Sequence, residues 1–360
     1  MQISVITTKE KWLGLKPQWN PLLQASGSSA CFLTFEWLMA WAECFLFPSF
    51  PSGRLHILTF HEKDRLIGIA PFCLLVQKRG PIKYRMLQFI GAPQAGSDYL
   101  DVIAQKGREK EVATALYDYL VSRRFWDILS LHDIPSGSLF LLHFFNCIER
   151  GGKYAEMKPS AYCPAVSIHN GFDEYFAGLS KNRKKKFKQD LRVIHRDHKV
   201  EHKIADGNDA ALNLPRFFRF YTKTSNRGGE SLQNMLQRYA AQCSPDIPFQ
   251  IDFLEVNGRP VSGLLHLKHN TALAMYIMAV DKNFDARLSM GNLIVGMCIE
   301  NAYHNGYRTY DFLKGDEAYK FHWANNGTKT LALMFWNKRS AGIAFALTDL
   351  IKNAGKLLLP

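Results

Sequence analysis

The chain has 360 residues and a mass of 41.1 kDa, which suggests two domains at roughly 100–200 residues per domain. Hydrophobic residues make up 47% and charged residues 21%, close to the globular average, so wholesale disorder is excluded. Lys and Arg exceed Asp and Glu by 13 (45 − 32), which favours anionic partners such as nucleotides, nucleic acid or phosphorylated substrates.

Cysteine usage and hydropathy point to a cytosolic protein. The seven cysteines form neither a CxxC pair nor a Cys/His metal spacing, which is typical of reduced thiols. The first residues lack the continuous apolar stretch of a secretory signal, and no run of 18 apolar residues predicts a membrane-spanning helix. We therefore expect a cytoplasmic location, with peripheral contact with the inner membrane left open.

The first half of the chain is predicted to be rich in strands. Strands are expected at residues 54–60, 65–76, 84–91, 100–104 and 126–132. One helix is expected at residues 108–123, where apolar side chains recur at helical spacing (Val112, Leu116, Tyr119 and Leu120).

The second half repeats this plan. Three strands are expected at residues 248–256, 259–268 and 271–280, and Asn257-Gly258 is a dipeptide typical of tight hairpin turns. A loop over 281–292 leads to a helix at 293–304, and a strand follows at 307–313. The order of meander, helix and strand occurs twice, which indicates an internal duplication.

The repeat predicts a mixed α/β protein of two tandem domains, residues 1–160 and 161–360, with the boundary between 151 and 164. A further strand is expected at 328–336, followed by an amphipathic helix from about Ser340. The apolar stripe of this last helix would either dock on the rest of the protein, such as the first domain, or lie in a membrane interface beside Lys338 and Arg339.

The loop that precedes the helix at 293–304 is a candidate phosphate site. It reads Arg287-Leu288-Ser289-Met290-Gly291-Asn292. The start of a helix presents unpaired N–H groups and a positive dipole end, Gly291 would let the backbone approach a diphosphate, and Arg287 would add charge. Strands on both sides of this helix favour a nucleotide at the sheet edge. The alternative is that Gly291 is only a helix cap.

Reactive side chains are concentrated directly after the strand at 307–313. This segment includes Asp316, Glu317, Tyr319 and Lys320. Loops at strand ends commonly carry chemistry. Tyr319 could protonate a leaving thiolate, and Lys320 could stabilise an oxyanion or a phosphate. The alternative is a solvated charged loop above packed aromatic side chains.

A basic amphipathic helix is expected from Lys181. Between Lys181 and Lys203 there are ten Lys or Arg residues and three acids, a sum of +7, and Phe187, Leu191 and Ile194 define an apolar face. Three interpretations stay open: a solvated face, a site for an anionic substrate or cofactor, and an RNA-binding surface. The interleaved aromatic residues typical of single-strand binding are absent.

Other catalytic and metal-binding motifs are missing from the sequence. There is no G-x-S-x-G, P-loop or G-x-G-x-x-G pattern. His195 and His198 are three residues apart, but no acid or cysteine completes a metal site with them, so no metal is expected.

Taken together, residues 180–192, 257–267 and 287–323 resemble the GNAT-type acetyltransferases of the CelD class. These are associated with cellulose and other exopolysaccharide biosynthesis, and are distant relatives of the Fem peptidyltransferases, which have two tandem GNAT-like domains. The most specific element is the pattern G-D-E-x-Y-K-x-x-W at residues 315–323. In the first half, Ser97-Asp98-Tyr99-Leu100-Asp101 and Trp126-Asp127-Ile128-Leu129 also fit, so the resemblance covers roughly residues 30–325.

The resemblance implies direct transfer of an acyl group from acyl-CoA to an amine. The pantetheine arm would lie between splayed parallel strands at 271–280 and 307–313, and backbone N–H groups of the first strand would polarise the thioester carbonyl. The diphosphate would lie over five consecutive residues, Ser289, Met290, Gly291, Asn292 and Leu293.

The resemblance also implies roles for individual side chains. Asp316 and Glu317 are the candidate bases, Tyr319 is the candidate acid, and Lys320 is an electrostatic contributor. Arg183 would contact an anionic substrate, and Asp98 and Tyr99 would contact substrate from the first domain.

This sequence departs from the family in its phosphate loop. The GNAT pattern R/Q-x-x-G-x-G/A lacks its second Gly here, and the Ser-Pro-Gly of the CelD class reads Ser289-Met290-Gly291. Weaker or altered CoA binding is therefore expected. The first half has no comparable loop, so we expect it to shape the acceptor cleft.

The acceptor implied by the resemblance is an amino sugar or nucleotide-linked sugar used in envelope or exopolysaccharide synthesis. Two alternatives stay open. A Fem-like aminoacyl-tRNA-dependent transferase would explain the basic helix by tRNA binding. A degenerate GNAT pair would act as a non-catalytic scaffold, with membrane contact through the last helix.

Overall fold

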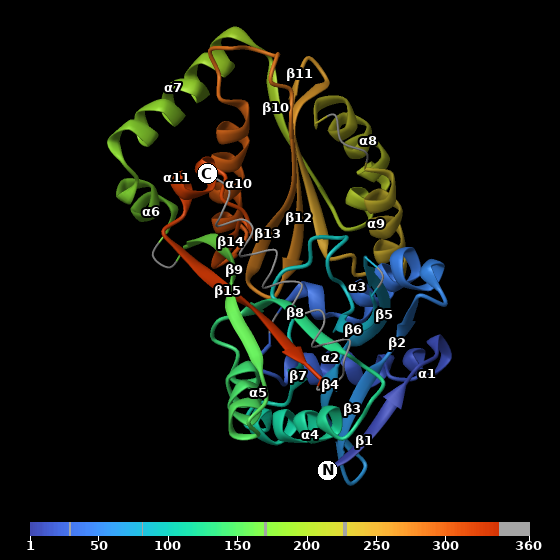
Figure 1. Cartoon of the computed structure of the whole chain (residues 1–360). Helices are drawn as coiled ribbons and strands as arrows, with labels where there is room; N and C mark the ends of the chain where they lie inside the picture. Colours follow the sequence, from blue (N-terminus) through green and yellow to red (C-terminus); the bar gives the residue numbers. More distant parts are fainter. Residues whose placement is uncertain (29, 81, 169–170, 226–228, 338–360) are drawn as a thin grey trace. The chain divides into compact units, whose positions relative to one another are not determined.

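The computed structural model describes residues 1–28, 30–80, 82–168, 171–225 and 229–337 (Figure 1). The chain divides into two compact units: Met1–Ser160 with the segment that begins at Thr330, and Ala161–Lys329. The second domain was expected to span residues 161–360. Residues 330–336 instead pair with the strand at 128–135, which belongs to the first unit. The helix expected from about Ser340 lies outside the described residues.

The first unit contains two sets of paired strands. One is a four-stranded antiparallel sheet in the order β1 (Gln2–Ile6), β3 (Ile57–Glu62), β4 (Arg65–Ala70) and β7 (Ile103–Ala104). In the other, β8 (Ile128–Pro135) lies between β15 (Asn326–Trp336) and β6 (Ile82–Phe89), and β5 (Phe72–Arg79) and β2 (Gly53–Leu55) follow.

Helices flank these strands of the first unit. The α-helices are α1 (Lys9–Leu13), α2 (Lys16–Gln24), α3 (Phe35–Trp41), α4 (Glu109–Val121) and α5 (Leu139–Arg150). Three single turns of other helix types are η1 (Cys31–Leu33), η2 (Ala42–Leu46) and η3 (Phe47–Ser49). Trp12, Trp19 and Phe35 pack as one aromatic cluster, with ring centroids 5.7–6.0 Å apart, which fixes α1, α2 and α3 to one another.

Two strands expected in the first half are each divided between the two sets. The strand expected at 54–60 is split into β2 and β3 at His56, and the strand expected at 65–76 is split into β4 and β5 at Pro71. Proline has no N–H to donate to a strand ladder, so Pro71 is a position where pairing is interrupted. The helix expected at 108–123 is confirmed as α4.

The second unit is built on one sheet. Its strands are ordered β10 (Val200–Asp206), β11 (Phe249–Val256), β12 (Arg259–His269), β13 (Ala272–Val280), β14 (Thr309–Asp311) and the end of β9 (Ala155–Ser167). The three-stranded meander at 248–280 is confirmed, and Asn257 takes the positive φ (51°) that its turn requires.

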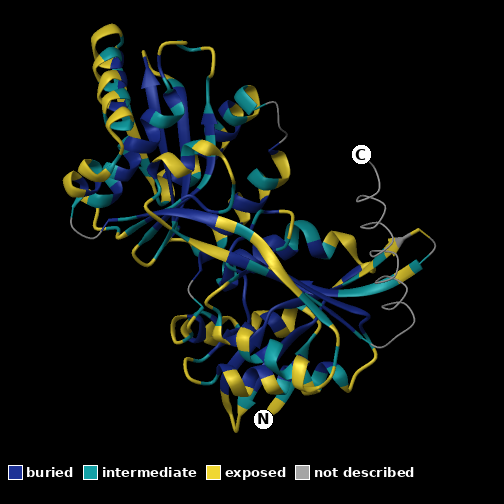
Figure 2. Cartoon of the chain, turned by 60° about the vertical axis from the view of Figure 1, so that its left-hand side comes forward, coloured by how far each residue is buried: buried dark blue, intermediate teal, exposed yellow. Residues whose placement is uncertain are grey.

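Helices cover both faces of this sheet. On β11, Phe253 packs on Phe217 of α8 (Asn208–Ser225), whereas its neighbour Leu254 belongs to the core under α10 (Met290–His304). Successive side chains of a strand point to opposite faces, so α8 and α10 lie on opposite sides of the sheet. Burial on both sides explains why every residue of β11 is buried, and Figure 2 shows the strands mainly in the colour of buried residues.

The remaining helices of the second unit are α6 (Phe172–Gly178), α7 (Lys181–Asp197), α9 (Glu230–Cys243) and α11 (Ala318–Trp323). The basic amphipathic helix expected from Lys181 is α7, and Phe187 and Ile194 are buried on its apolar face. The helix expected at 293–304 begins three residues earlier, so Met290, Gly291 and Asn292 form the first turn of α10. Among the described residues, no helix is long and apolar enough to cross a membrane.

The two parallel strands β13 and β14 are paired over only three residues. Ala272, Leu273 and Ala274 pair with Thr309, Tyr310 and Asp311. Beyond this point β13 continues to Val280 alongside β12, whereas the N–H of Phe312 bonds to Pro164 O on β9 at 2.9 Å. The two strands therefore part at Ala274 and Asp311, at the end of the sheet where α10 begins.

Close packing of α7, α10 and α11 depends on Gly296. A methyl group at this position would lie 2.3 Å from Phe187 Cε2 and 2.7 Å from Trp323 Cη2, two side chains that meet edge to face. Both are buried, so neither ring can move aside freely.

We predict that Gly296→Ala destabilises the second unit by about 1–3 kcal/mol through overpacking, despite the higher helix propensity of Ala. Urea unfolding measures this change. Gly178→Ala is the matched control, because nothing lies within 4 Å of the position its methyl group would take. Equal stability of the two variants would contradict this account of the packing.

Candidate functional site

A cleft of about 1030 Å³ lies in the second unit, between the helices α6 and α7, the start of α10 and the end of α11. Its polar side chains come from these separate elements, and several of them are cationic or hydrogen-bond donors. The lining includes Ser180, Asn182, Arg183, Lys186, Ser289, Asn292, His322, Asn325 and Asn326.

The side chain of Asn292 joins three of the elements around the cleft. Its Oδ1 accepts hydrogen bonds from Arg183 NH1 at 2.9 Å and from Trp323 Nε1 at 3.2 Å. Its Nδ2 donates to Ser289 Oγ at 2.7 Å. One amide thus fixes the positions of α7, α10 and α11 relative to one another.

Arg183 is a cation of the cleft that two other elements hold in place. Its guanidinium lies over the Trp323 ring, 5.5 Å from the centroid, in addition to the bond to Asn292. Burial lowers the pKa of Arg183, but a guanidinium stays charged in proteins. Because Ser180 caps α7 by accepting a bond from the Arg183 N–H at 3.3 Å, Arg183 is held in the first turn of the helix.

A carboxylate of the chain lies at the start of α10. Asp190, on the buried face of α7, has its Oδ2 3.4 Å from the N–H of Ser289 and its Oδ1 2.8 Å from Lys186 Nζ. Lys186 also donates to Arg287 O at 3.0 Å. The N–H of Ser289, the first at this helix start, is therefore already directed at the Asp190 carboxylate. Lys186 balances the charge of that carboxylate.

The next three N–H groups of α10, those of Met290, Gly291 and Asn292, donate to no other residue that the structure describes. Gly291 does not need a positive φ, and a methyl group there would lie 3.5 Å from Met278 Sδ and Val280 Cγ2. These are ordinary van der Waals contacts, so alanine would also fit where the first turn of α10 lies beside β13, and only a larger side chain would not. Met290 and Leu293 are buried and do not line the cleft.

Arg287 is exposed but already paired. Its guanidinium lies 2.7 Å from Asp285 Oδ2 and 3.0 Å from Asp197 Oδ2. Because two carboxylates share this cation, its charge contributes less to an anionic ligand than the sequence suggested.

The predicted catalytic residues lie in and beside α11. The ammonium of Lys320 is buried, 3.0 Å from Glu317 Oε2 and 2.8 Å from Lys314 O. Asp316 and the Glu317 side chain are exposed. Tyr319 is half-buried against Phe312, and burial together with the charge of Glu317 raises the pKa of its phenol well above the usual range.

A close approach shapes the loop before α11. Gly315 has a φ of +147°, and a methyl group there would come within 2.1 Å of Glu317 Oε2 and 2.4 Å of Lys320 Nζ. Only glycine therefore lets the Lys320–Glu317 pair close under this loop. Tyr319, Lys320, Glu317 and Asp316 do not line the cleft, although Phe321 and His322 of the same helix do.

Asp98 and Tyr99 belong to the first unit, in the loop that follows β6. Asp98 is buried, and Tyr99 has a φ of +56°. Their expected contact with substrate stays a prediction.

Sequence reasoning missed several cleft residues. Lys186, Asn182 and His322 were not singled out, although the basic run and the 310–323 segment contained them. The pairing of Lys186 with Asp190 at a spacing of four was a readable signal of their contact.

Comparison with known proteins finds a family model that matches part of the second unit. Residues 181–321 match the family model described as an acetyltransferase (GNAT) domain. No curated protein matches the sequence. The expected fold class, a mixed α/β protein of two tandem GNAT-like domains, is confirmed.

Several solved structures share the fold over nearly the whole chain. The crystal structure of FemX is similar over 93% of this chain and 97% of that chain, with 11% identity and a TM-score of 0.60. A protein of unknown function from Bacteroides thetaiotaomicron covers 93% and 100%, with 11% identity and a TM-score of 0.54. L-PGS from Bacillus licheniformis covers 92% and 95%, with 11% identity and a TM-score of 0.51.

We predict that Arg183→Ala weakens the binding of inorganic pyrophosphate to this protein about tenfold, a loss of about 1.4 kcal/mol, because it removes the ordered cation of the cleft. Isothermal titration calorimetry measures the change. Arg219→Ala, an exposed arginine of α8, is the control and should bind as the unchanged protein does. Equal weakening by both substitutions would show that only net charge matters.

Proposed function

We propose that this protein is an acyl-CoA-dependent N-acyltransferase whose second unit binds the acyl donor. The observation that carries the proposal is the parting of β13 from β14 after three paired residues. A GNAT domain match over residues 181–321 supports the reaction class, and the gap supports a thioester donor.

The space between β13 and β14, beyond their three paired residues, would give the carbonyl of the acyl group access to main-chain N–H donors. Residues 275 and 277–280 of β13 pair with β12, a β-bulge skips Tyr276, and no strand among the described residues pairs with the other side of this stretch. In an extended strand alternate N–H groups point to opposite sides, so those that do not face β12 point toward the side from which β14 has departed. Such N–H groups can polarise a thioester carbonyl and stabilise the oxyanion that forms on attack.

The diphosphate of CoA fits the first turn of α10, with one restriction. The N–H groups of Met290, Gly291 and Asn292 are available, and Arg183 and Lys186 line the adjacent cleft. Asp190 lies at the N–H of Ser289, so a diphosphate would have to lie beyond that group, toward the arginine. This restriction agrees with the sequence, in which the phosphate loop lacks the second Gly of the GNAT pattern.

The reaction would proceed by direct transfer. The nitrogen of an amine acceptor attacks the thioester carbonyl, the C–N bond forms, and the C–S bond breaks to release CoA thiolate. Asp316 or Glu317, both exposed, would take the proton that the amine loses. Tyr319, which its raised pKa keeps protonated, would return a proton to the thiolate, and Lys320 would contribute a positive charge nearby.

The acceptor and the setting are proposals on the CelD resemblance. An amine on an envelope or exopolysaccharide precursor is the acceptor class, and Asp98 and Tyr99 of the first unit would contact it. A cytoplasmic reaction, with peripheral contact with the inner membrane, would suit such an acceptor.

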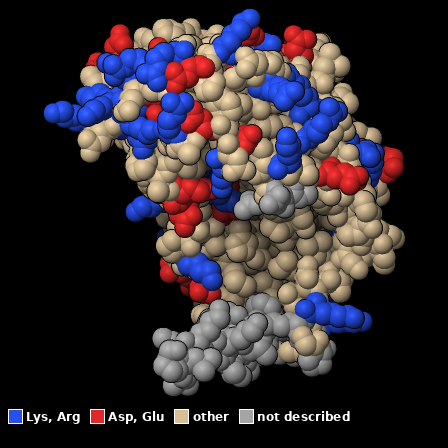
Figure 3. Space-filling view, turned by 90° about the horizontal axis from the view of Figure 1, so that it is seen from above, with Lys and Arg blue, Asp and Glu red and all other residues tan. Residues whose placement is uncertain are grey.

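A Fem-like aminoacyl-tRNA-dependent transferase is the second candidate, favoured by one further observation. The fold is shared with FemX, and α7 exposes Lys181, Lys185, Lys188 and Arg192 next to the cleft. In the view of Figure 3 many Lys and Arg side chains are visible, with Asp and Glu side chains among them. A basic surface of this kind would suit the phosphates of an RNA.

Calorimetry with acetyl-CoA and with charged tRNA distinguishes the donors. We expect acetyl-CoA to bind and to raise the melting temperature. Binding of charged tRNA with a steep dependence on salt, and no binding of acetyl-CoA, would instead establish the second candidate.

We predict that Gly291→Val raises the Kd for acetyl-CoA at least about tenfold, because its branches would press on Met278 and Val280 and move α10 away from β13. Gly291→Ala is the control, since its methyl group makes only ordinary contacts there. An unchanged Kd for the valine variant would remove the first turn of α10 from the donor site.

We predict that Lys320→Met lowers kcat about 10- to 100-fold and leaves the Kd for acetyl-CoA nearly unchanged, because the ammonium would act on the transition state. Steady-state kinetics with an amine acceptor and calorimetry together separate the two effects. Lys223→Met on α8, also a loss of one charge, should leave both quantities unchanged. Equal activity of the two variants would remove the proposed role of Lys320.

A further inference from the structure

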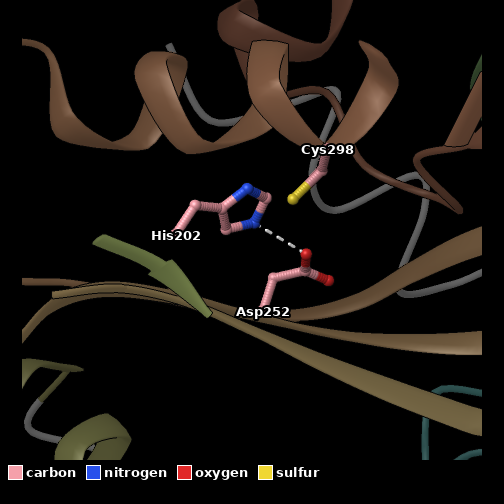
Figure 4. Close-up of side chains that lie close together, drawn as sticks. All are labelled: His202, Asp252 and Cys298. Atoms are coloured by element: carbon pink, nitrogen blue, oxygen red, sulfur yellow. Dashed lines mark hydrogen bonds and ion pairs between the residues drawn. The ribbon is translucent and has the colours of Figure 1, made fainter. Parts of the chain in front are cut away.

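A cluster of polar side chains is buried beneath α10, apart from the residues that line the cleft. His202 of β10, Asp252 of β11 and Cys298 of α10 converge there (Figure 4), and one donor atom from each lies within 4.8 Å of the others. Asp252 is fully buried, Cys298 is 1% exposed, and the His202 side chain is 16% exposed. The three residues are 50 and 46 positions apart in the sequence, so no local spacing reveals them.

A second histidine is directed at the same carboxylate. His266 of β12 is fully buried, and its Nδ1 lies 3.1 Å from Asp252 Oδ2 without the geometry of a hydrogen bond. Its other nitrogen, Nε2, is 2.8 Å from Tyr310 OH on β14. A histidine that binds a metal is typically oriented in this way, with the second ring nitrogen fixed by an oxygen partner.

The charges of the cluster favour a cation. The carboxylate of Asp252 is bonded by His202 Nε2 at 2.8 Å and by Gln250 Nε2 at 2.8 Å. A buried anion needs a compensating charge, and in the described part of the chain the ion pairs of Asp252 are made by the imidazoles of His202 and His266.

We propose that His202, Asp252, Cys298 and His266 form a structural zinc site. Imidazole and thiolate ligands together with one carboxylate suit Zn²⁺, and four protein ligands make a closed, tetrahedral site. The charges of Zn²⁺, the Asp252 carboxylate and the Cys298 thiolate sum to zero. The Cys298 thiol loses its proton to solvent on binding, and the metal replaces the hydrogen bond between His202 and Asp252.

Binding requires the ligand atoms to draw together, because those of His202, Asp252 and Cys298 lie within 4.8 Å of one another and His266 joins this group through Asp252, with its Nδ1 3.1 Å from Oδ2. Ligand atoms about 2.0–2.1 Å from zinc are about 3.3 Å apart in a tetrahedral site. His202 Nε2 and Asp252 Oδ1, now 2.8 Å apart, would separate by the difference. His202 is on β10, the edge strand of this sheet, and is partly exposed, so it can make this movement and give the metal access. The site would join α10 to β10, β11 and β12.

The test is the metal content of the whole chain, purified without chelators after zinc is supplied. We expect about one zinc per chain, the stoichiometry of one closed site, and a fall to below about a tenth of that in Cys298→Ser and His202→Gln. Cys243→Ser, a change of a half-buried cysteine on α9, should retain the metal. Cobalt exchanged into the site should show a thiolate-to-cobalt absorption band that Cys298→Ser removes.

Either of two results would overturn the proposal. One is a protein that takes up no zinc and whose melting temperature does not change when zinc is added or chelated. The other is zinc that is retained equally in Cys298→Ser, His202→Gln and Cys243→Ser, which would place the metal elsewhere. If the Cys298 and His202 variants fail to fold, the cobalt spectrum of the unchanged protein decides, because absence of a thiolate band excludes Cys298 as a ligand.

Discussion

The short pairing between β13 and β14 is the constraint on which the site depends. After Ala274 and Asp311 the two strands take different neighbours, β12 for one and β9 for the other. The departure leaves one side of β13 without a strand partner among the described residues, at the end of the sheet where α10 starts. A parallel pair that continued to Val280 would satisfy the same N–H groups internally and leave none for a ligand.

The cleft at the start of α10 combines attraction for an anion with a limit on how close an anion can approach the helix. Asn292 holds Arg183 and the buried Trp323 in place, so the Arg183 cation lines the cleft in a fixed position with the Trp323 ring behind it. Asp190, neutralised by Lys186, already lies at the first N–H of α10. A phosphate-bearing ligand of the kind we propose would be held in this cleft by side chains of α7 as much as by the helix dipole.

The sequence predicted those features that are local. The meander, α7, α10 and the GNAT-type fold followed from periodicity, turn dipeptides and the resemblance, and each is confirmed. Contacts between distant residues were out of reach: nothing in the sequence shows that Asp285 and Asp197 pair with Arg287, or that Asp190 lies at Ser289. The division of residues 65–76 into two strands could have been predicted from Pro71. It was missed because the largely apolar run around the proline is typical of one continuous strand. The site residues named for catalysis remain predictions.

Amide hydrogen exchange with and without saturating acetyl-CoA tests the central claim most directly. The account predicts slower exchange on ligand addition at residues 275–280 of β13 and at residues 290–292, because a bound thioester and its diphosphate would accept hydrogen bonds from N–H groups in these two segments. Exchange that stays unchanged in both segments while acetyl-CoA is bound would contradict it, since the donor would then lie outside the gap between β13 and β14.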